Sequence, residues 1–285
     1  KGGGIESDLT VTRIEKNIFL LIVPVSTIQR DLFWINKHKT NYNVTITDIT
    51  PSEAVFLIMG PNSRNFLQSI SPNDLSNNNH PFGYARNIEL GYGFARAHRI
   101  SYVGELGWEL YISAEQSCHI YEFIRKEGEK YNLKLCGLHS LDSCRIEKAY
   151  RHFGHDITDE DHVLEAGLGF AVDTKKNFIG KEAVLNKLEL GLNKYLFQFQ
   201  LLDPSFMLFH NEPILRNGEI VSYITSGNFG HSLGSAIGLG YVPCKNENIS
   251  DVLNSDFEIE ISGHKIKSKI STKPLYDPRG RKIYI

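Results

Sequence analysis

The sequence predicts an α+β protein that ends in a small antiparallel β-barrel or sandwich. Strand-like runs rich in Val, Ile, Leu and Phe dominate the first half, and helical segments are interleaved with them without a regular βαβ alternation. Short strand candidates then follow one another closely in the last third. With 285 residues, of which 41% are hydrophobic, the chain can bury a substantial core and form two or three small domains.

The first half combines both kinds of element. Strands are expected where apolar runs are bounded by polar residues or Pro, at residues 17–25, 44–49 and 54–59. A helix is expected after Ser113, a suitable N-cap residue, and others from Pro61 and across residues 137–150.

The region after about residue 194 changes in character. Its strand candidates are residues 195–202, 212–215, 220–225, 235–242, 257–261 and 265–271. Asn217-Gly218 is the strongest two-residue hairpin signal, and Ser262-Gly263 marks a second turn. We therefore expect a first domain over residues 1–190 and a barrel domain over residues 194–275, with a short helix after Gly180 near their junction.

Charge and cysteine content exclude several classes of partner. Thirty-one Lys and Arg residues against 33 Asp and Glu residues give a net charge of -2, so no overall field favours nucleic acid or an acidic membrane. The four cysteines form no CxxC pair, which argues against zinc and dithiol chemistry, and no metal is expected. No apolar run approaches the roughly 18 to 20 residues that span a bilayer. A soluble protein with a small-molecule partner fits best.

The chain starts with a Gly triplet that leads into Ile5-Glu6-Ser7-Asp8, an acidic turn ahead of an apolar alternation. Such a start resembles the middle of a domain, and we expect the N-terminal part of the fold to be missing. Partial burial would raise the pKa of Asp8 towards that of a useful base. Composition alone does not separate Asp8 from Glu6 and Ser7, and a solvated carboxylate in a turn is the ordinary alternative.

A Gly-rich segment at residues 91–96 has two glycines at dinucleotide-fingerprint spacing, but Arg96 stands where a third small residue belongs. A bend between two strands is the better interpretation.

The segment at residues 101–111 points more directly to a ligand. Glu109 follows Trp108 near the start of an expected strand, where its two oxygens could accept a pair of N–H hydrogen bonds from a flat heterocycle such as a pterin or purine. The alternative is an exposed Glu on an edge strand.

Charged residues crowd the end of the helix expected at residues 137–150. His152, His155 and Asp156 could bind a metal, but no further ligand is evident. A network of ion pairs and hydrogen bonds that includes Arg145 and stabilises the helix end is the better interpretation.

Several segments in one order carry a family resemblance. They are GGGIESDLTV, MGPNSRNFL, SYVGELGWELYI, RIEKAYRHFGHDIT, LEAGLGFAVD, FIGKEA and NGEIVSYITSGNFGHSLGSAIGLGYV. Together they strongly resemble the folate-binding aminomethyltransferase fold of the glycine cleavage T-protein, in the version fused to the C-terminus of sarcosine and dimethylglycine dehydrogenases. The resemblance implies a cloverleaf of subdomains around a tetrahydrofolate site.

The resemblance also implies roles for individual residues. It places the family's catalytic Asp on Asp8, with Ser7 where the T-protein has a second acid. The pterin-binding Glu falls on Glu109, and the Tyr at the head of the same motif falls on Tyr102. An Arg that helps to hold folate in the T-protein corresponds to Leu141, an apolar choice similar to that of the dehydrogenases.

The implied function is capture of an iminium or formaldehyde unit as 5,10-methylenetetrahydrofolate within a sarcosine or dimethylglycine dehydrogenase. FAD would belong to a flavin domain that is absent from this sequence. A stand-alone aminomethyltransferase and a non-catalytic regulator on the same fold are the alternatives. The implied location is the mitochondrial matrix or, alternatively, the bacterial cytoplasm.

Overall fold

The computed structural model describes residues 2–245 and 247–285, so Lys1, the first residue of the predicted first domain, lies outside it. The chain forms two compact units that alternate along the sequence. The barrel unit comprises the residues up to Asp8 together with Leu138–Pro278, and the sheet unit comprises Leu9–Gly137 and Arg279–Ile285. The domain boundary expected near residues 190–194 stays a prediction.

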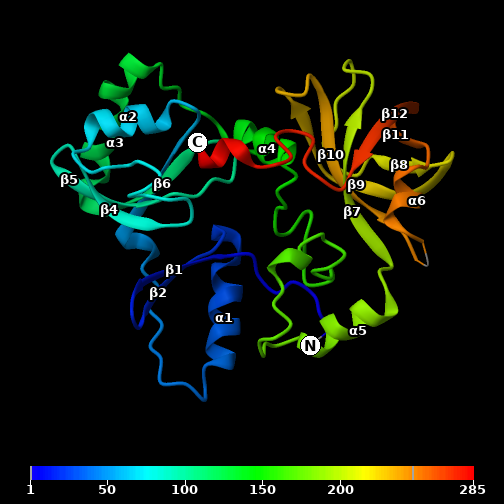
Figure 1. The fold of residues 1–285 in the computed structure, drawn as a ribbon, viewed down its shortest axis with the longest axis horizontal. Helices are drawn as coiled ribbons and strands as arrows, with labels where there is room; N and C mark the ends of the chain where they lie inside the picture. Colours follow the sequence, from blue (N-terminus) through cyan, green and yellow to red (C-terminus); the bar gives the residue numbers. More distant parts are fainter. Residues whose placement is uncertain (1, 246) are drawn as a thin grey trace. The chain divides into compact units, whose positions relative to one another are not determined.

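The sheet unit is built on an antiparallel sheet with the strand order β3-β6-β5-β4 (Figure 1). The strands are β3 (Glu53–Met59), β4 (Ala85–Leu90), β5 (Gly93–His98) and β6 (Gly107–Ser113). Helices α2 (Ser63–Ile70) and α3 (Ala114–Gly128) contribute Phe66, Leu67, Ile120 and Ile124 to a core with the sheet. Because side chains alternate along a strand, Trp108, Leu110 and Ile112 of β6 all face this core. The opposite face of β6 is therefore free for polar residues.

The first part of the sheet unit is a hairpin of β1 (Thr10–Glu15) and β2 (Ile18–Ile22), followed by the 3-10 turn η1 (Val25–Thr27) and helix α1 (Ile28–His38). The strand expected at residues 17–25 therefore forms, although it ends earlier. The strand expected at residues 44–49 was wrong, because this segment has neither helix nor strand. Val44 and Ile49 are exposed, so this segment packs on no core. Without a partner strand, its apolar alternation is not enough to form a strand. A 3-10 turn, η2 (Thr50–Ser52), then leads into β3.

The other expectations for the first half are close to the structure. Helix α2 begins two residues after Pro61, and α3 begins directly after Ser113. The Gly-rich segment at residues 91–96 forms the turn between β4 and β5, with Gly91 at a φ of 57°. The bend interpretation is therefore confirmed.

A 3-10 turn, η3 (Glu129–Tyr131), follows α3, and η5 (Arg281–Tyr284) lies at the end of the chain.

The barrel unit contains a closed antiparallel barrel with the strand order β10-β7-β12-β11-β8-β9 (Figure 1). Its strands are β7 (Lys194–Leu201), β8 (Pro213–Arg216), β9 (Glu219–Gly230), β10 (Ser235–Pro243), β11 (Phe257–Ile261) and β12 (His264–Ser271). Phe197, Phe199 and Phe257 fill its interior together with aliphatic residues. Each strand expected after residue 194 is present, which confirms the barrel.

Both predicted hairpin turns adopt the left-handed backbone that their residues permit. Asn217 and Gly218 have φ values of 53° and 88°, and Ser262 and Gly263 have φ values of 50° and 81°. Two consecutive positive φ angles match the twist of an antiparallel hairpin, as the Asn-Gly signal predicts.

Helix α4 (Leu138–Glu147) packs on the outside of the barrel, where Ile146 joins Leu196, Ile237 and Leu239 in a second core. The segment that follows has little regular structure apart from η4 (Gly169–Ala171) and leads to α5 (Lys181–Leu190), which begins directly after Gly180 as expected. Helix α6 (Ile249–Leu253) lies between β10 and β11. Across residues 2–245 and 247–285, no helix is both long and apolar enough to cross a membrane.

Candidate functional site

The segment that leads to Asp8 is held in the barrel unit by backbone hydrogen bonds of Ile5 and by the close approach of Gly4 to the neighbouring backbone. The amide of Ile5 donates hydrogen bonds to the carbonyl oxygens of Thr158 and Asp161, at 3.3 and 3.1 Å. A Cβ on Gly4 would lie 1.6 Å from the carbonyl oxygen of Asp159, so only glycine permits this approach. Gly4, the last residue of the unusual Gly triplet, therefore has a structural reason, since it allows the chain to dock just before Asp8.

Asp8 itself has a perturbed carboxyl group. Its side chain is exposed by surface area, yet partial desolvation by the surrounding chain raises its pKa above the usual value, and the positive charge of His152 opposes this rise. The neighbouring Ser7 hydroxyl is buried and has no hydrogen-bond partner among the described residues. Asp8 thus combines access to solvent with a pKa shifted in the direction that suits a base.

Glu109 lies on the polar face of the sheet unit. Strand β6 begins at Gly107, where a Cβ would lie 2.7 Å from the carbonyl oxygen of Ile58, so glycine permits close pairing with β3. Glu109 pairs with Leu57 on β3 and with His98 on β5, and it is half-buried. The alternative of an exposed Glu on an edge strand is therefore wrong, because β6 lies between β3 and β5.

Tyr111 is the nearest partner of Glu109. Its hydroxyl donates a hydrogen bond to Oε2 of Glu109 at 2.6 Å. Desolvation raises the pKa of Glu109, and this hydrogen bond lowers it in part. Oε1 and the second lone pair of Oε2 remain able to accept hydrogen bonds. A carboxylate with two free acceptor positions beside Leu57 and Val55, both more than 40% exposed, matches a flat ligand with a pair of N–H donors.

A network of charged and aromatic groups supports Tyr111 from β3 and β5. Arg96 forms a 2.6 Å ion pair with Glu53, and its guanidinium lies 5.3 Å from the centre of the Tyr111 ring. The His98 ring packs on Tyr111 with 4.4 Å between ring centres. Arg96 Nε donates to Nε2 of His98 at 3.2 Å. His98 is buried, and desolvation followed by the charge of Arg96 lowers its pKa to about 4, so it is neutral near pH 7.

Tyr102 lies in the loop between β5 and β6, seven residues before Glu109 in the sequence and in the same unit. Its side chain is half-buried, and Gly104 in the same loop has a φ of 73°. The contact of Tyr102 with a ligand stays a prediction, as do the roles of Asp8 and Glu109.

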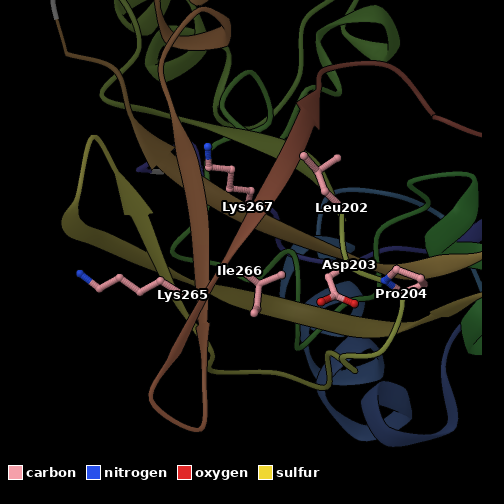
Figure 2. A pocket seen from close by; sticks show the side chains of 6 residues that line it. All are labelled: Leu202, Asp203, Pro204, Lys265, Ile266 and Lys267. Carbon is pink, nitrogen blue, oxygen red and sulfur yellow. The ribbon is translucent and has the colours of Figure 1, made fainter.

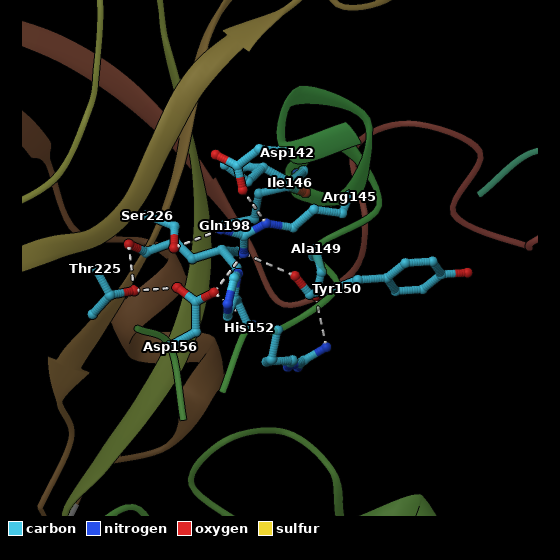
Figure 3. Close-up of polar contacts among 12 residues, drawn as sticks. Asp142, Arg145, Ile146, Ala149, Tyr150, His152, Asp156, Gln198, Thr225 and Ser226 are labelled. Carbon is cyan, nitrogen blue, oxygen red and sulfur yellow. Dashed lines mark hydrogen bonds and ion pairs between the residues drawn. The ribbon is translucent and has the colours of Figure 1, made fainter. Parts of the chain in front are cut away.

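The charged end of α4 forms a buried network in the barrel unit (Figure 3). Arg145 contacts Asp142 at 2.6 Å, Asp156 at 2.5 Å and the Ser226 hydroxyl at 2.8 Å. Asp156 also accepts a hydrogen bond from the Thr225 hydroxyl at 2.5 Å. The network interpretation of this region is confirmed, and it connects α4 and the following loop to barrel strand β9.

Sequence reasoning missed the polar support on the sheet face. Tyr111 could have been predicted to lie beside Glu109, because it stands two residues later and residues two apart on a strand share a face. The sequence gives no such indication for Glu53, Arg96 and His98, since only the strand register places them beside β6.

Two of the surface cavities are lined by other residues of the barrel unit. One, of about 460 Å³, is on the barrel, where Lys265, Ile266 and Lys267 of β12 line it with residues 202–204 (Figure 2). The other, of about 490 Å³ in the same unit, is polar and is lined by Glu6, His162 and Lys187 among others. Neither is lined by Asp8, Tyr102 or Glu109, so the volume of a cavity does not identify the predicted site.

Comparisons with known proteins agree with this architecture. Residues 1–176 match the GCVT N-terminal domain, and residues 194–277 match the glycine cleavage T-protein C-terminal barrel domain. In a search of solved structures, the crystal structure of glycine cleavage system aminomethyltransferase T from Bartonella henselae has a TM-score of 0.83 at 23% identity, covering 97% of this chain and 74% of that one. This likeness shows the shared fold.

Sequence relatives are of two kinds. 4-Methylaminobutanoate oxidase (formaldehyde-forming) from Paenarthrobacter nicotinovorans is 36% identical over 98% of this chain and 34% of its own length. Human mitochondrial dimethylglycine dehydrogenase is 32% identical over 96% of this chain and 32% of its own length. Aminomethyltransferase from Shouchella clausii is 31% identical over 97% of this chain and 74% of its own length. The chain thus spans about a third of the first two relatives. It belongs to the glycine cleavage T-protein family and has the folate-binding aminomethyltransferase fold.

Proposed function

We propose that this chain is the tetrahydrofolate-dependent one-carbon-transfer region of a dehydrogenase or oxidase of N-methyl amino acids such as sarcosine or dimethylglycine. The observation that carries the folate site is the half-buried Glu109 carboxylate, oriented by Tyr111 on a sheet face with exposed Val55 and Leu57. The 36% identity to an oxidase and the 32% identity to a dehydrogenase, each over almost the whole chain, support the proposed context.

In this proposal, Glu109 and Tyr102 bind the folate and Asp8 transfers a proton. Glu109 accepts two hydrogen bonds from the pterin, and Tyr102 contacts the same ring. Bound tetrahydrofolate would supply the amine nucleophile that takes up the one-carbon unit. Asp8 accepts the proton that this amine loses, a task for which its raised pKa is suited. FAD, which would oxidise the N-methyl group, is assigned to a different domain.

Calorimetric titration with tetrahydrofolate tests the binding half of the proposal. Glu109→Gln replaces one acceptor oxygen with a donor, so we expect affinity to fall by about tenfold or more. Glu89→Gln, at an exposed residue of edge strand β4 in the same sheet, is the matched control and should bind like the wild type. Equal binding by Glu109→Gln and the wild type would show that the pterin assignment is wrong.

A stand-alone aminomethyltransferase is the second candidate. It is favoured by the 31% identity to an aminomethyltransferase of which this chain covers 74%. A GxGxxG flavin fingerprint encoded upstream of this region would support the dehydrogenase, whereas aminomethyl transfer from a lipoyl carrier protein would support the stand-alone enzyme. The presence of Asp8, Tyr102 and Glu109 argues against a non-catalytic regulator, and the predicted compartments remain the mitochondrial matrix and the bacterial cytoplasm.

A further inference from the structure

Tyr111 is a buried aromatic residue on the same face of β6 as Glu109. It is 5% exposed, yet it is absent from the apolar core, because it projects from the opposite face of β6. Its hydroxyl donates to Oε2 of Glu109 at 2.6 Å. The two residues are neighbours on one face of the same strand, so the backbone of β6 determines their separation.

The ring of Tyr111 is held on two sides. His98 packs against it from β5, and the Arg96 guanidinium lies over it. Arg96 cannot move freely, since Glu53 on β3 holds it at 2.6 Å and its Nε donates to His98. Because Nε2 of neutral His98 accepts that bond, its proton is on Nδ1, 3.5 Å from the Thr12 hydroxyl oxygen. Four strands of one unit therefore determine where the Tyr111 hydroxyl lies.

We propose that Tyr111 is the positioning residue for Glu109, and that its hydrogen bond orients the carboxylate toward a ligand with a pair of N–H donors. This inference rests on the proposed folate site. Tyr111 itself does not need to contact the ligand. Because the Tyr111 hydroxyl donates to Oε2, the Glu109 carboxylate cannot rotate without losing this short hydrogen bond. Oε1 and the second lone pair of Oε2 therefore keep constant directions.

The hydroxyl is a permanent donor. Burial and the nearby negative charge of Glu109 raise the pKa of Tyr111, so its proton stays in place throughout the working pH range. Its hydrogen bond lowers the pKa of Glu109, against the rise that desolvation causes. Without the hydroxyl, Glu109 would become protonated at a higher pH and would then offer a donor where the ligand needs an acceptor.

A double-mutant cycle with 5-formyltetrahydrofolate as the probe tests this role. Tyr111→Phe removes only the hydroxyl, and we expect calorimetry to show about tenfold weaker binding. In the Glu109→Gln background the same change should alter affinity by less than about twofold, because Tyr111 acts through Glu109. Tyr131→Phe is the control, since its ring packs on Phe66 in the core of the same unit. Equal losses from Tyr111→Phe in both backgrounds would assign Tyr111 a general structural role and overturn the proposal.

A second measurement needs no ligand. The pKa of Glu109, followed by carboxyl carbon NMR, should rise in Tyr111→Phe and stay unchanged in Tyr131→Phe. An unchanged Glu109 pKa in Tyr111→Phe overturns the positioning role even if the wild type binds the probe. If the wild type binds neither the probe nor tetrahydrofolate, the folate function fails and the positioning role for such a ligand fails with it, whatever the NMR result.

Discussion

Arg145 of α4 donates a hydrogen bond from Nη1 to Oδ2 of Asp156 at 2.5 Å, and the two side chains are 2% and 0% exposed. Such a pair is stable only when its other hydrogen-bonding positions are filled, as they are here by Asp142, Ser226 and Thr225. The pair connects α4 to the loop after it, within the unit that carries Asp8.

Removing one member of this pair should destabilise the barrel unit strongly. Asp156→Ala leaves Arg145 as a buried charge without its main partner, and we expect the free energy of unfolding to fall by about 3–5 kcal/mol. Urea denaturation measures the change. Glu127→Gln, at the exposed pair of Glu127 with Lys130, is the control and should leave the midpoint unchanged. An Asp156→Ala protein as stable as the wild type would show that the network contributes no net stability.

The low pKa of His98 predicts how stability depends on pH. The folded value is about 4 and the ordinary value 6.5, so between them the unfolded chain binds more protons than the folded one. Stability should therefore rise with pH across this window, and the contribution of His98, on the order of 3 kcal/mol, should be lost as pH falls from 6.5 towards 4.

Urea denaturation at a series of pH values checks this expectation. His98→Gln cannot be protonated, so the slope of stability against pH should be smaller in this variant, even if it is less stable at every pH. His139→Gln, at an exposed histidine, is the control and should keep the wild-type slope. An identical slope in His98→Gln and the wild type would exclude His98 as its source.

Asp8→Asn should separate chemistry from binding. The amide cannot accept a proton as the carboxylate does, so we expect formation of methylenetetrahydrofolate from tetrahydrofolate and formaldehyde, above the spontaneous rate, to fall by about 10²- to 10⁴-fold. Folate affinity should change little. In the wild type the rate should fall on acidification with a midpoint above 3.8, because the Asp8 pKa is raised and the base must be ionised.

Glu6→Gln is the matched control for Asp8→Asn, since the sequence alone left Glu6 as an alternative base. It should keep the wild-type rate. A large loss in Glu6→Gln with none in Asp8→Asn would transfer the proton-accepting role to Glu6.

The glycine docking of the N-terminal segment predicts a position-specific effect. Gly4→Ala brings a Cβ against the Asp159 carbonyl, so the segment must move, and we expect a loss of about 1–3 kcal/mol in stability. Gly2→Ala meets nothing within 4 Å and is the control. Limited proteolysis near Ile5 should be faster in Gly4→Ala than in Gly2→Ala. Equal protection of the two variants would show that this contact does not hold the segment.

Local patterns explain which parts of the fold were predictable. The barrel strands alternate clearly, and Asn217-Gly218 specifies its hairpin through backbone conformations that these two residues accept at little cost. The same kind of apolar run at residues 44–49 predicted a strand that does not form, because pairing depends on a neighbour that no local pattern supplies. Asp8 and Glu109 were singled out by sequence, through the composition around them and the family resemblance.

What the sequence determined by itself was the family, the barrel and the chemical types of residue at the predicted site. Only the tertiary structure placed Glu53, Arg96 and His98 around Tyr111, because strand register brings together residues that lie far apart along the chain. Burial also belongs to the folded state, and it sets the pKa shifts of Asp8, His98 and Glu109. A carboxylate can therefore be recognised in the sequence, whereas its ionisation and orientation depend on the groups that the fold places around it.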